Sequence, residues 1–290
     1  MDQPLALDHI VIAVNDLDTA ITDYRALGFQ VLVGGQHPGR TSHNALVVFA
    51  DGSYLEIIAW RAPAPEERWC RTLRDHGEGL VDFALLPHDT AQALAEARAR
   101  GLDTLTGPLD GGRVRPDGAQ LLWQTARHAT PDVPFFCGDI TPRALRVPEG
   151  AVRIHPNGAL GVATLTVAVH DLNVTLARYQ ALLGPKASIA RAAGAGPDDA
   201  RGVRTATVTV GTLTITLQSA PADARAAHTA HTAHSPPESA HADALRQRLA
   251  TRGEGPCAVG LRRAPGDAAE MFNVNACHGV ALHWEPPHTS

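Results

Sequence analysis

Long apolar runs, closely spaced cysteines and an excess of positive charge are all missing from this 290-residue sequence. No run of about 18 apolar residues occurs, which argues against a membrane-spanning helix. The formal net charge of −5 argues against a general nucleic-acid partner, because such proteins carry a basic face. The four cysteines form no CxxC pair, which is typical of reduced thiols rather than of a disulfide framework or a zinc knuckle. Together with an N-terminus that lacks a signal-peptide pattern, these absences predict a cytoplasmic protein.

Two catalytic signatures are missing as well. No GxSxG motif is present and no cysteine lies in a recognisable catalytic signature, so the sequence gives no support for nucleophilic catalysis. The glycine-rich residues 34–40 are not followed by a Gly-Lys-Ser or Gly-Lys-Thr triplet, which excludes a nucleotide-binding P-loop. Aromatic residues make up only 4% of the chain, so each tryptophan and phenylalanine is informative about where a pocket lies.

Two apolar, β-branched stretches near the N-terminus each contain one ionisable residue. Residues 7–14 contain His9, residues 54–60 contain Glu56, and both stretches are predicted to be strands. An ionisable side chain in an apolar strand needs a partner, a cavity or a strand end. Because side chains alternate across a sheet, we expect His9 and Glu56 to point into the same concave cup. The alternative is a buried pair, or two polar residues in a wet pocket, without a functional role.

An internal similarity relates the first part of the chain to the second. Residues 14–27 align without a gap with residues 169–182, and residues 73–79 align with residues 249–255. The two offsets differ because of an insertion that contains three regularly spaced histidines, from His228 to His234. We interpret this histidine segment as a flexible low-complexity loop, with metal scavenging as the alternative.

These matches predict a duplicated chain. The first half is expected over residues 1–145 and the second over residues 156–290, with two modules in each half. In the first module, residues 18–27 have the apolar spacing of a helix, and Asn15-Asp16 is expected to cap its first turn. The last module of the second half keeps only part of the pattern, so we expect it to be degenerate.

Four short motifs in the first half resemble one known family. They are Leu7-Asp8-His9-Ile10-Val11, Asn15-Asp16-Leu17, Ser42-His43-Asn44-Ala45-Leu46 and Tyr54-Leu55-Glu56. They are similar to the bacterial glyoxalase-like domain proteins of the vicinal oxygen chelate superfamily. The resemblance implies an α+β fold in which βαβββ modules pair into two cup-like halves, with the working cup in the first half.

The resemblance also implies a metal site whose ligands lie on the first and last strands of a module. His9 and Glu56 occupy those positions, and an alignment of the second module with the first places Asp82 opposite His9. Asp82 is therefore the third candidate ligand, and His43 could replace one of the three. Imidazole and carboxylate ligands suit iron, manganese, zinc or nickel. The position opposite Glu56 falls near Phe136 or Cys137, which departs from the four-ligand pattern of glyoxalase I.

The second half offers an internal comparison. When residue 14 is aligned with residue 169, Thr164 takes the position of His9. A similar alignment gives Thr216 the position of Glu56. The second half thus keeps the strands and replaces both ionisable groups. Since the fold alone gives no reason for this difference, we expect the site in the first half.

The residues expected around the cup suit a small carboxylate or carbonyl compound, because they combine aromatic walls with a cation. The candidate substrate-binding residues are His43, Asn44, Trp60, Arg113, Trp123 and Phe136. Two functions remain open. The first is an enzyme of the lyase, isomerase or dioxygenase type, with Glu56 as the catalytic residue and a divalent metal as Lewis acid. The second is a metal-free protein that sequesters a small molecule. Either is expected to be a monomer or homodimer without nucleic-acid or membrane partners.

Overall fold

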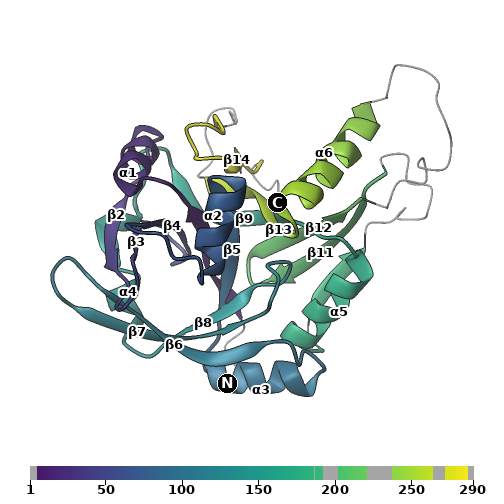
Figure 1. Cartoon of the computed structure of the whole chain (residues 1–290), viewed down its shortest axis with the longest axis horizontal. Coiled ribbons are helices and arrows are strands. Elements are labelled where there is room, and N and C mark those ends of the chain that lie inside the picture. Colours follow the sequence, from purple (N-terminus) through teal and green to yellow (C-terminus); the bar gives the residue numbers. More distant parts are fainter. Residues whose placement is uncertain (1–4, 186, 192–201, 221–236, 264–271, 287–290) are drawn as a thin grey trace.

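The structure, a computed structural model, describes residues 5–185, 187–191, 202–220, 237–263 and 272–286. The histidine segment from His228 to His234 lies outside these residues. Two β-sheets with helices packed against them make up the fold (Figure 1), which confirms the predicted α+β class. Among the described helices, none is both long enough and apolar enough to cross a membrane.

The first sheet closes into a barrel of two βαβββ modules. The strand order is β1-β4-β3-β2-β6-β7-β8-β5, so each module contributes four neighbouring strands. The first module consists of β1 (Ala6–Ala13), α1 (Leu17–Ala26), β2 (Leu32–Gln36), β3 (Ser42–Val48) and β4 (Tyr54–Trp60). The second consists of β5 (Gly79–Leu86), α3 (Thr90–Ala99), β6 (Thr106–Val114), β7 (Gln120–Arg127) and β8 (Phe135–Asp139). The cap predicted for α1 is confirmed, because the Asp16 carboxylate accepts from the backbone N–H of Thr19.

Strand β1 lies between β4, to which it is parallel, and β5, to which it is antiparallel. Its even-numbered residues, such as Ile10 and Ile12, pack outward in the main hydrophobic core, together with Tyr24 of α1. Val11 and Ala13 belong to a separate apolar cluster inside the barrel. The alternation read from the sequence therefore describes the two faces of this strand correctly.

One irregularity in β1 changes which side chains point inward. Leu7 pairs with Leu85 and His9 pairs with Ala84, so Asp8 is the extra residue of a β-bulge. A bulge breaks the strict alternation of side chains, and it allows two successive residues to lie on the same side of a sheet. As a result the Asp8 and His9 side chains are close enough for a hydrogen bond.

The second sheet has six strands in the order β10-β11-β12-β9-β13-β14. In this sheet Thr164 pairs with Thr214, as His9 pairs with Tyr54 in the barrel. The bulge recurs too, because Ala163 is the unpaired residue between Val162 and Thr164. The strands are β9 (Ala159–Ala168), β10 (Ser188–Arg191), β11 (Arg204–Val210), β12 (Leu213–Ser219), β13 (Gly255–Arg263) and β14 (Ala281–Trp284), with helices α5 (Leu172–Leu183) and α6 (Pro237–Arg252).

Three short helical segments connect these parts. Helix α2 (Arg68–His76) lies between the two barrel modules and runs beside β5 (Figure 1). Helix α4 (Arg143–Arg146) and the 3₁₀ turn η1 (Gly150–Arg153) lie between the barrel and the second sheet. Two of these segments contact the barrel strands through their side chains, because Trp69 of α2 donates to Asp82 and Arg146 of α4 donates to Asp8.

Candidate functional site

His9 and Glu56 meet inside the barrel. Their closest atoms, His9 Nε2 and Glu56 Oε2, are 3.3 Å apart, and the two residues are only 3% and 7% exposed. The other ring nitrogen of His9, Nδ1, lies 2.6 Å from Asp8 Oδ2. The imidazole ring stacks on Tyr54 with the ring centres 4.8 Å apart, which fixes its orientation. His9 is thus a bridge between two buried carboxyl groups.

Glu56 has a second set of partners on its other oxygen. Asn44 Nδ2 donates to Glu56 Oε1 at 2.6 Å, and His37 Nε2 lies 3.8 Å from the same oxygen. Burial alone would raise the pKa of Glu56, but His9, His37, Asn44 and Arg113 together lower it below its usual range. Burial also lowers the pKa of His37. At neutral pH the site therefore holds an ionised carboxylate next to a neutral imidazole.

Two arginines of α4 bind the carboxylate of Asp8, next to His9. Arg146 Nη1 donates to Asp8 Oδ2 at 2.7 Å and to Tyr54 Oη at 2.8 Å, and Arg146 Nε donates to Asp139 Oδ1 at 2.5 Å. Arg143 Nη1 donates to Asp8 Oδ1 at 2.6 Å. Burial would raise the pKa of Asp8, but Arg146, His9 and Arg143 hold it well below its usual range. Asp8 is therefore a fixed anion that orients His9.

Aromatic rings and one arginine line another part of the interior. The guanidinium carbon of Arg127 lies 4.5 Å from the ring centre of Trp69 and 4.4 Å from that of Phe135. No carboxylate of the described residues forms an ion pair with Arg127. Trp60 and Trp123 pack against the same apolar cluster. The arrangement offers a cation and flat apolar surfaces to a bound molecule.

Asp82 does not join His9 and Glu56. Its carboxylate accepts from Arg68 and, at 2.9 Å, from the indole N–H of Trp69. Among the described residues, the one group of side chains with the spacing of metal ligands does not include Asp82. We therefore remove Asp82 from the candidate ligand set, because α2 already supplies the partners that compensate its buried charge.

Asp82→Asn is expected to lower the free energy of unfolding by about 2 kcal/mol, because a charge-assisted hydrogen bond becomes a neutral one. The metal content of the protein should not change. Chemical denaturation with and without chelator, together with elemental analysis, measures both quantities. Asp75→Asn is the matched control, since Asp75 pairs with Arg74 on the exposed side of α2 and should have no effect. An apo protein stabilised by Asp82→Asn would return Asp82 to the metal-ligand candidates.

The structure places the other predicted residues in four different surroundings. Asn44, Trp60 and Trp123 lie at the barrel interior. His43 points away from it, and the charged residues that act on it are Arg61, Asp18 and Asp16. Phe136 belongs to the outer core, and its neighbour Phe135 forms the interior wall instead. Arg113 lies in the wall itself, between Asn44 and the backbone carbonyl of Arg146.

A divalent metal is the cofactor that the resemblance implies, and one described group of donors has suitable spacing. Asp8, His9 and Cys137 offer ligand atoms within 4.8 Å of one another. The surrounding charges do not suit a cation, because two arginines already bind Asp8 and Arg146 Nη1 lies 3.7 Å from Cys137 Sγ. Burial raises the pKa of the Cys137 thiol to about 12, so a metal would have to displace a tightly held proton to bind it. The group therefore fits a metal in spacing but not in charge.

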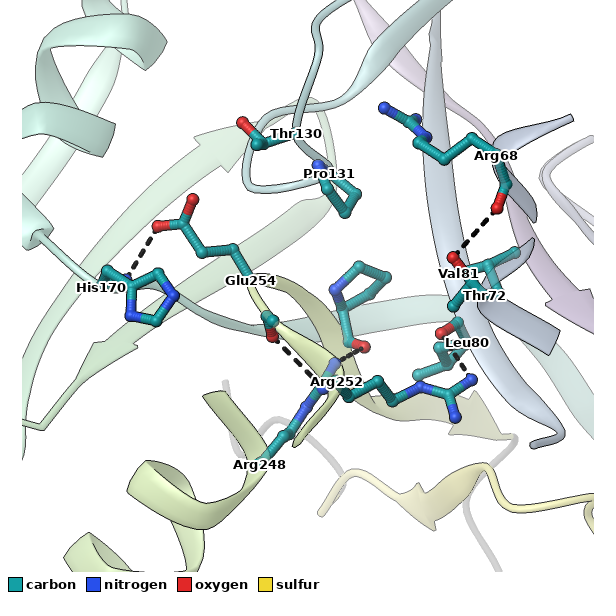
Figure 2. Close-up of a pocket in the computed structure, with 12 residues that line it drawn as sticks. Arg68, Thr72, Leu80, Val81, Thr130, Pro131, His170, Arg248, Arg252 and Glu254 are labelled. Carbon is teal, nitrogen blue, oxygen red and sulfur yellow. Dashed lines mark hydrogen bonds between the residues drawn. The ribbon is translucent and has the colours of Figure 1, made fainter. Parts of the chain in front are cut away.

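A cavity of about 280 Å³ lies between the two halves, away from His9 and Glu56. Figure 2 shows Arg248 and Arg252 from the second half facing Arg68 and Leu80 from the first. Arg252 Nη1 donates to the backbone carbonyl of His76 at 2.8 Å, and Arg248 Nη2 donates to that of Pro256 at 2.7 Å. These arginines join α6 to the end of α2 and to β13. We therefore interpret this region as an interface between the halves, and we place the candidate active site in the barrel.

Comparisons with known proteins agree with this fold. Residues 7–183, more than half of the chain, match the model of the glyoxalase-like domain family. No curated protein matches the sequence. A hypothetical protein from Staphylococcus aureus is similar in structure, with a TM-score of 0.68, 12% identity, and coverage of 98% of this chain and 100% of that one. A triple mutant of 4-hydroxymandelate synthase from Streptomyces coelicolor has a TM-score of 0.55 at 14% identity, covering 91% and 72% of the two chains.

At these identities the structural similarity concerns the fold alone, while the family match rests on the sequence. The barrel of paired βαβββ modules is the arrangement that the N-terminal motifs led us to expect. The chain therefore belongs to the glyoxalase-like domain family.

Proposed function

We propose that the barrel interior binds a small carbonyl-containing carboxylate and that Glu56 removes a proton from the carbon next to its carbonyl group. The observation that carries the proposal is the ionised Glu56 carboxylate, buried between His9 and His37. In this step a C–H bond breaks, the proton moves to Glu56, and the electron pair moves onto the carbonyl oxygen. Return of the proton to the same or a neighbouring carbon, with the electron pair moving back from the oxygen, completes an isomerase type of reaction.

The neighbouring groups suit this chemistry. Neutral His37 can donate a hydrogen bond to the oxygen on which charge develops. His9 is held by Asp8 in a fixed orientation, so it positions the other oxygen of Glu56. An anionic substrate raises the pKa of Glu56 by charge repulsion, which makes Glu56 a stronger base when the substrate is bound.

Arg127 is the group that we assign to the substrate carboxylate. It lies over Trp69 and Phe135 and forms no ion pair among the described residues, where the main negative charge acting on it is that of Asp82. A guanidinium binds a carboxylate through two parallel hydrogen bonds, and this geometry also orients the bound molecule. The aromatic rings on either side favour a substrate with a flat or apolar body.

Arg127→Gln is expected to weaken binding of small 2-oxo acids roughly 10- to 100-fold, the loss typical of one charge-assisted contact. Titrations followed by tryptophan fluorescence measure this affinity, because Trp69 lies against Arg127. Arg71→Gln, on the same helix as Trp69 but bonded only to the backbone carbonyl of Pro65, is the matched control. Equal affinities for the two variants would remove Arg127 from the substrate site.

Proton removal is tested directly by deuterium exchange. The protein is incubated in D₂O with a panel of 2-oxo acids, and incorporation of deuterium next to the carbonyl is followed by NMR. Exchange above the uncatalysed rate supports an enzyme. Tight binding without exchange supports the second candidate, a sequestering protein, which the deep burial of His9 and Glu56 favours.

A divalent metal acting as Lewis acid is the alternative source of the same carbonyl activation. The approach of both His9 and His37 to Glu56 is the observation in its favour. Elemental analysis of protein purified without an affinity tag, repeated after deletion of residues 227–235, separates a metal in the barrel from one held by the histidine segment.

A further inference from the structure

A second cavity, of about 500 Å³, lies outside the barrel. It is enclosed by the first residues of β2, the turn that follows β6, and the segment after α4. Most of its wall is apolar, and the apolar side chains are those of Val31, Leu32, Val33, Pro116, Leu145, Pro148 and Val152. A cavity of this size and composition is typical of sites for small organic molecules.

The remaining wall carries an excess of positive charge. Arg25, Arg113 and Arg115 line the cavity, and Asp117 is the only acidic residue among the lining residues. Asp117 pairs with Arg115 at 2.7 Å. Arg25 donates to the backbone carbonyl of Val31. Neither Arg25 nor Arg113 forms an ion pair with a carboxylate of the described residues, and Arg113 has only the more distant carboxylate charge of Glu56 acting on it.

Arg113 is the unusual member of this group. It is only 3% exposed, its Nε has no hydrogen-bond partner among the described residues, and its other nitrogens contact only neutral oxygens. Such a buried guanidinium is costly unless a negative charge approaches it. Because Arg113 lines the cavity, an anion bound there could pair with its guanidinium group.

The two modules of the barrel are joined by little strand pairing beside this cavity. Strands β2 and β6 pair only through Gln36 and Val114 within the described residues, so the strands separate beside the cavity. Gly34 of β2 lies in the gap, where an added Cβ would be 2.1 Å from Asn44 Oδ1 and 2.8 Å from Arg113 Nη1. The absence of a side chain at Gly34 thus lets Arg113 reach Asn44 across the gap.

We propose that this outer cavity binds a monocarboxylate with a linear apolar tail, whose head pairs with Arg113 and whose tail lies along Leu145 and Val33. The apolar wall disfavours strongly hydrated anions such as phosphate, because their polar oxygens would lose water without gaining enough donors. The site is separate from the barrel interior and does not depend on the reaction proposed for Glu56.

Isothermal titration with octanoate tests the proposal. Wild-type protein should bind one octanoate, and octan-1-ol should bind at least tenfold more weakly because it lacks the charge. Leu145→Glu should reduce octanoate affinity at least tenfold, since it places a carboxylate in the cavity mouth. Arg113→Gln should have a similar effect. Ile154→Glu is the matched control, because Ile154 is 71% exposed and does not line the cavity.

Two results would overturn the proposal. One is octanoate affinity that is absent in the wild type or unchanged in Leu145→Glu, a variant at a half-exposed surface position that should fold normally. The other is loss of octanoate binding in Arg127→Gln with retention in Leu145→Glu, which would place octanoate inside the barrel. Because Arg127 and Leu145 belong to different sites, failure here is distinguishable from failure of the proposed proton transfer.

Discussion

Glu56→Gln is expected to slow deuterium exchange into 2-oxo acids by about 10²- to 10⁴-fold, the range contributed by a positioned general base. Glutamine keeps the shape of the side chain and can still accept from Asn44, so substrate affinity should fall much less than the rate. NMR exchange rates and fluorescence titrations on the same samples separate the two effects. Thr216→Ala is the matched control, because Thr216 takes the corresponding place in the second sheet. Exchange that persists in Glu56→Gln would assign the proton to another group.

The same residue sets the acid limit of the reaction. The pKa of Glu56 lies below its ordinary value of 4.5, so the carboxylate remains ionised when the pH falls to that value. At substrate concentrations well below saturation, where the free protein sets the pH dependence, the wild-type exchange rate should therefore stay constant through the weakly acidic range. It should decrease only as the pH falls through the lowered pKa. A rate that halves already near neutral pH would indicate that a different group is the base.

Arg146→Met is expected to lower the free energy of unfolding by about 3–5 kcal/mol, because it leaves buried charges without their partner. Arg146 is 2% exposed and binds both Asp8 and Asp139. Methionine fills a similar volume but neutralises neither carboxylate. Guanidinium denaturation at neutral pH measures the loss. Arg143→Met is the matched control, since its side chain is 30% exposed and it makes fewer of these bonds, so its effect should be clearly smaller.

The pH dependence of stability checks the cause of this loss. Asp8 has a pKa well below its ordinary value of 3.8, so in the wild type its contribution is complete above that value and is lost as the pH falls below it. Without Arg146, burial raises the pKa of Asp8, and the variant should gain stability when the carboxyl becomes protonated in mild acid. A double variant, Asp8→Asn with Arg146→Met, should recover part of the lost stability. No recovery would show that the loss comes from packing alone.

The sequence alone predicted the parts of the molecule that follow from local chemistry. The β-branched runs around His9 and Glu56 became neighbouring strands, and the alternation of side chains placed both groups inside the barrel. Asp16 caps α1 because a short carboxylate before an apolar helix has free N–H groups within reach. These features depend on a few successive residues, and the sequence displays them directly.

The partners of His9 and Glu56 were harder to predict, because they come from distant segments or from irregular backbone. Arg146 and Arg127 are far from His9 in the sequence, and nothing in their local patterns indicates that they face the barrel interior. Asp82 was expected beside His9, but Arg68 and Trp69 of α2 bind its carboxylate instead. Asp8 offered one signal, a second charge in the same apolar strand, but the bulge that brings its side chain beside His9 is not visible in the sequence.

The bulge at Asp8 also bears on how such a site can arise. The second sheet has the same extra residue at the corresponding place, where it is Ala163 and carries no charge. The backbone irregularity is thus stable without any of the chemistry that the barrel builds on it. At this bulge two successive side chains lie on the same side of the sheet. Substitution of these two residues alone can therefore add or remove polar groups, while every strand keeps its register. The capacity to form a new site is in this sense a property of the backbone, because the bulge does not depend on the residues that use it.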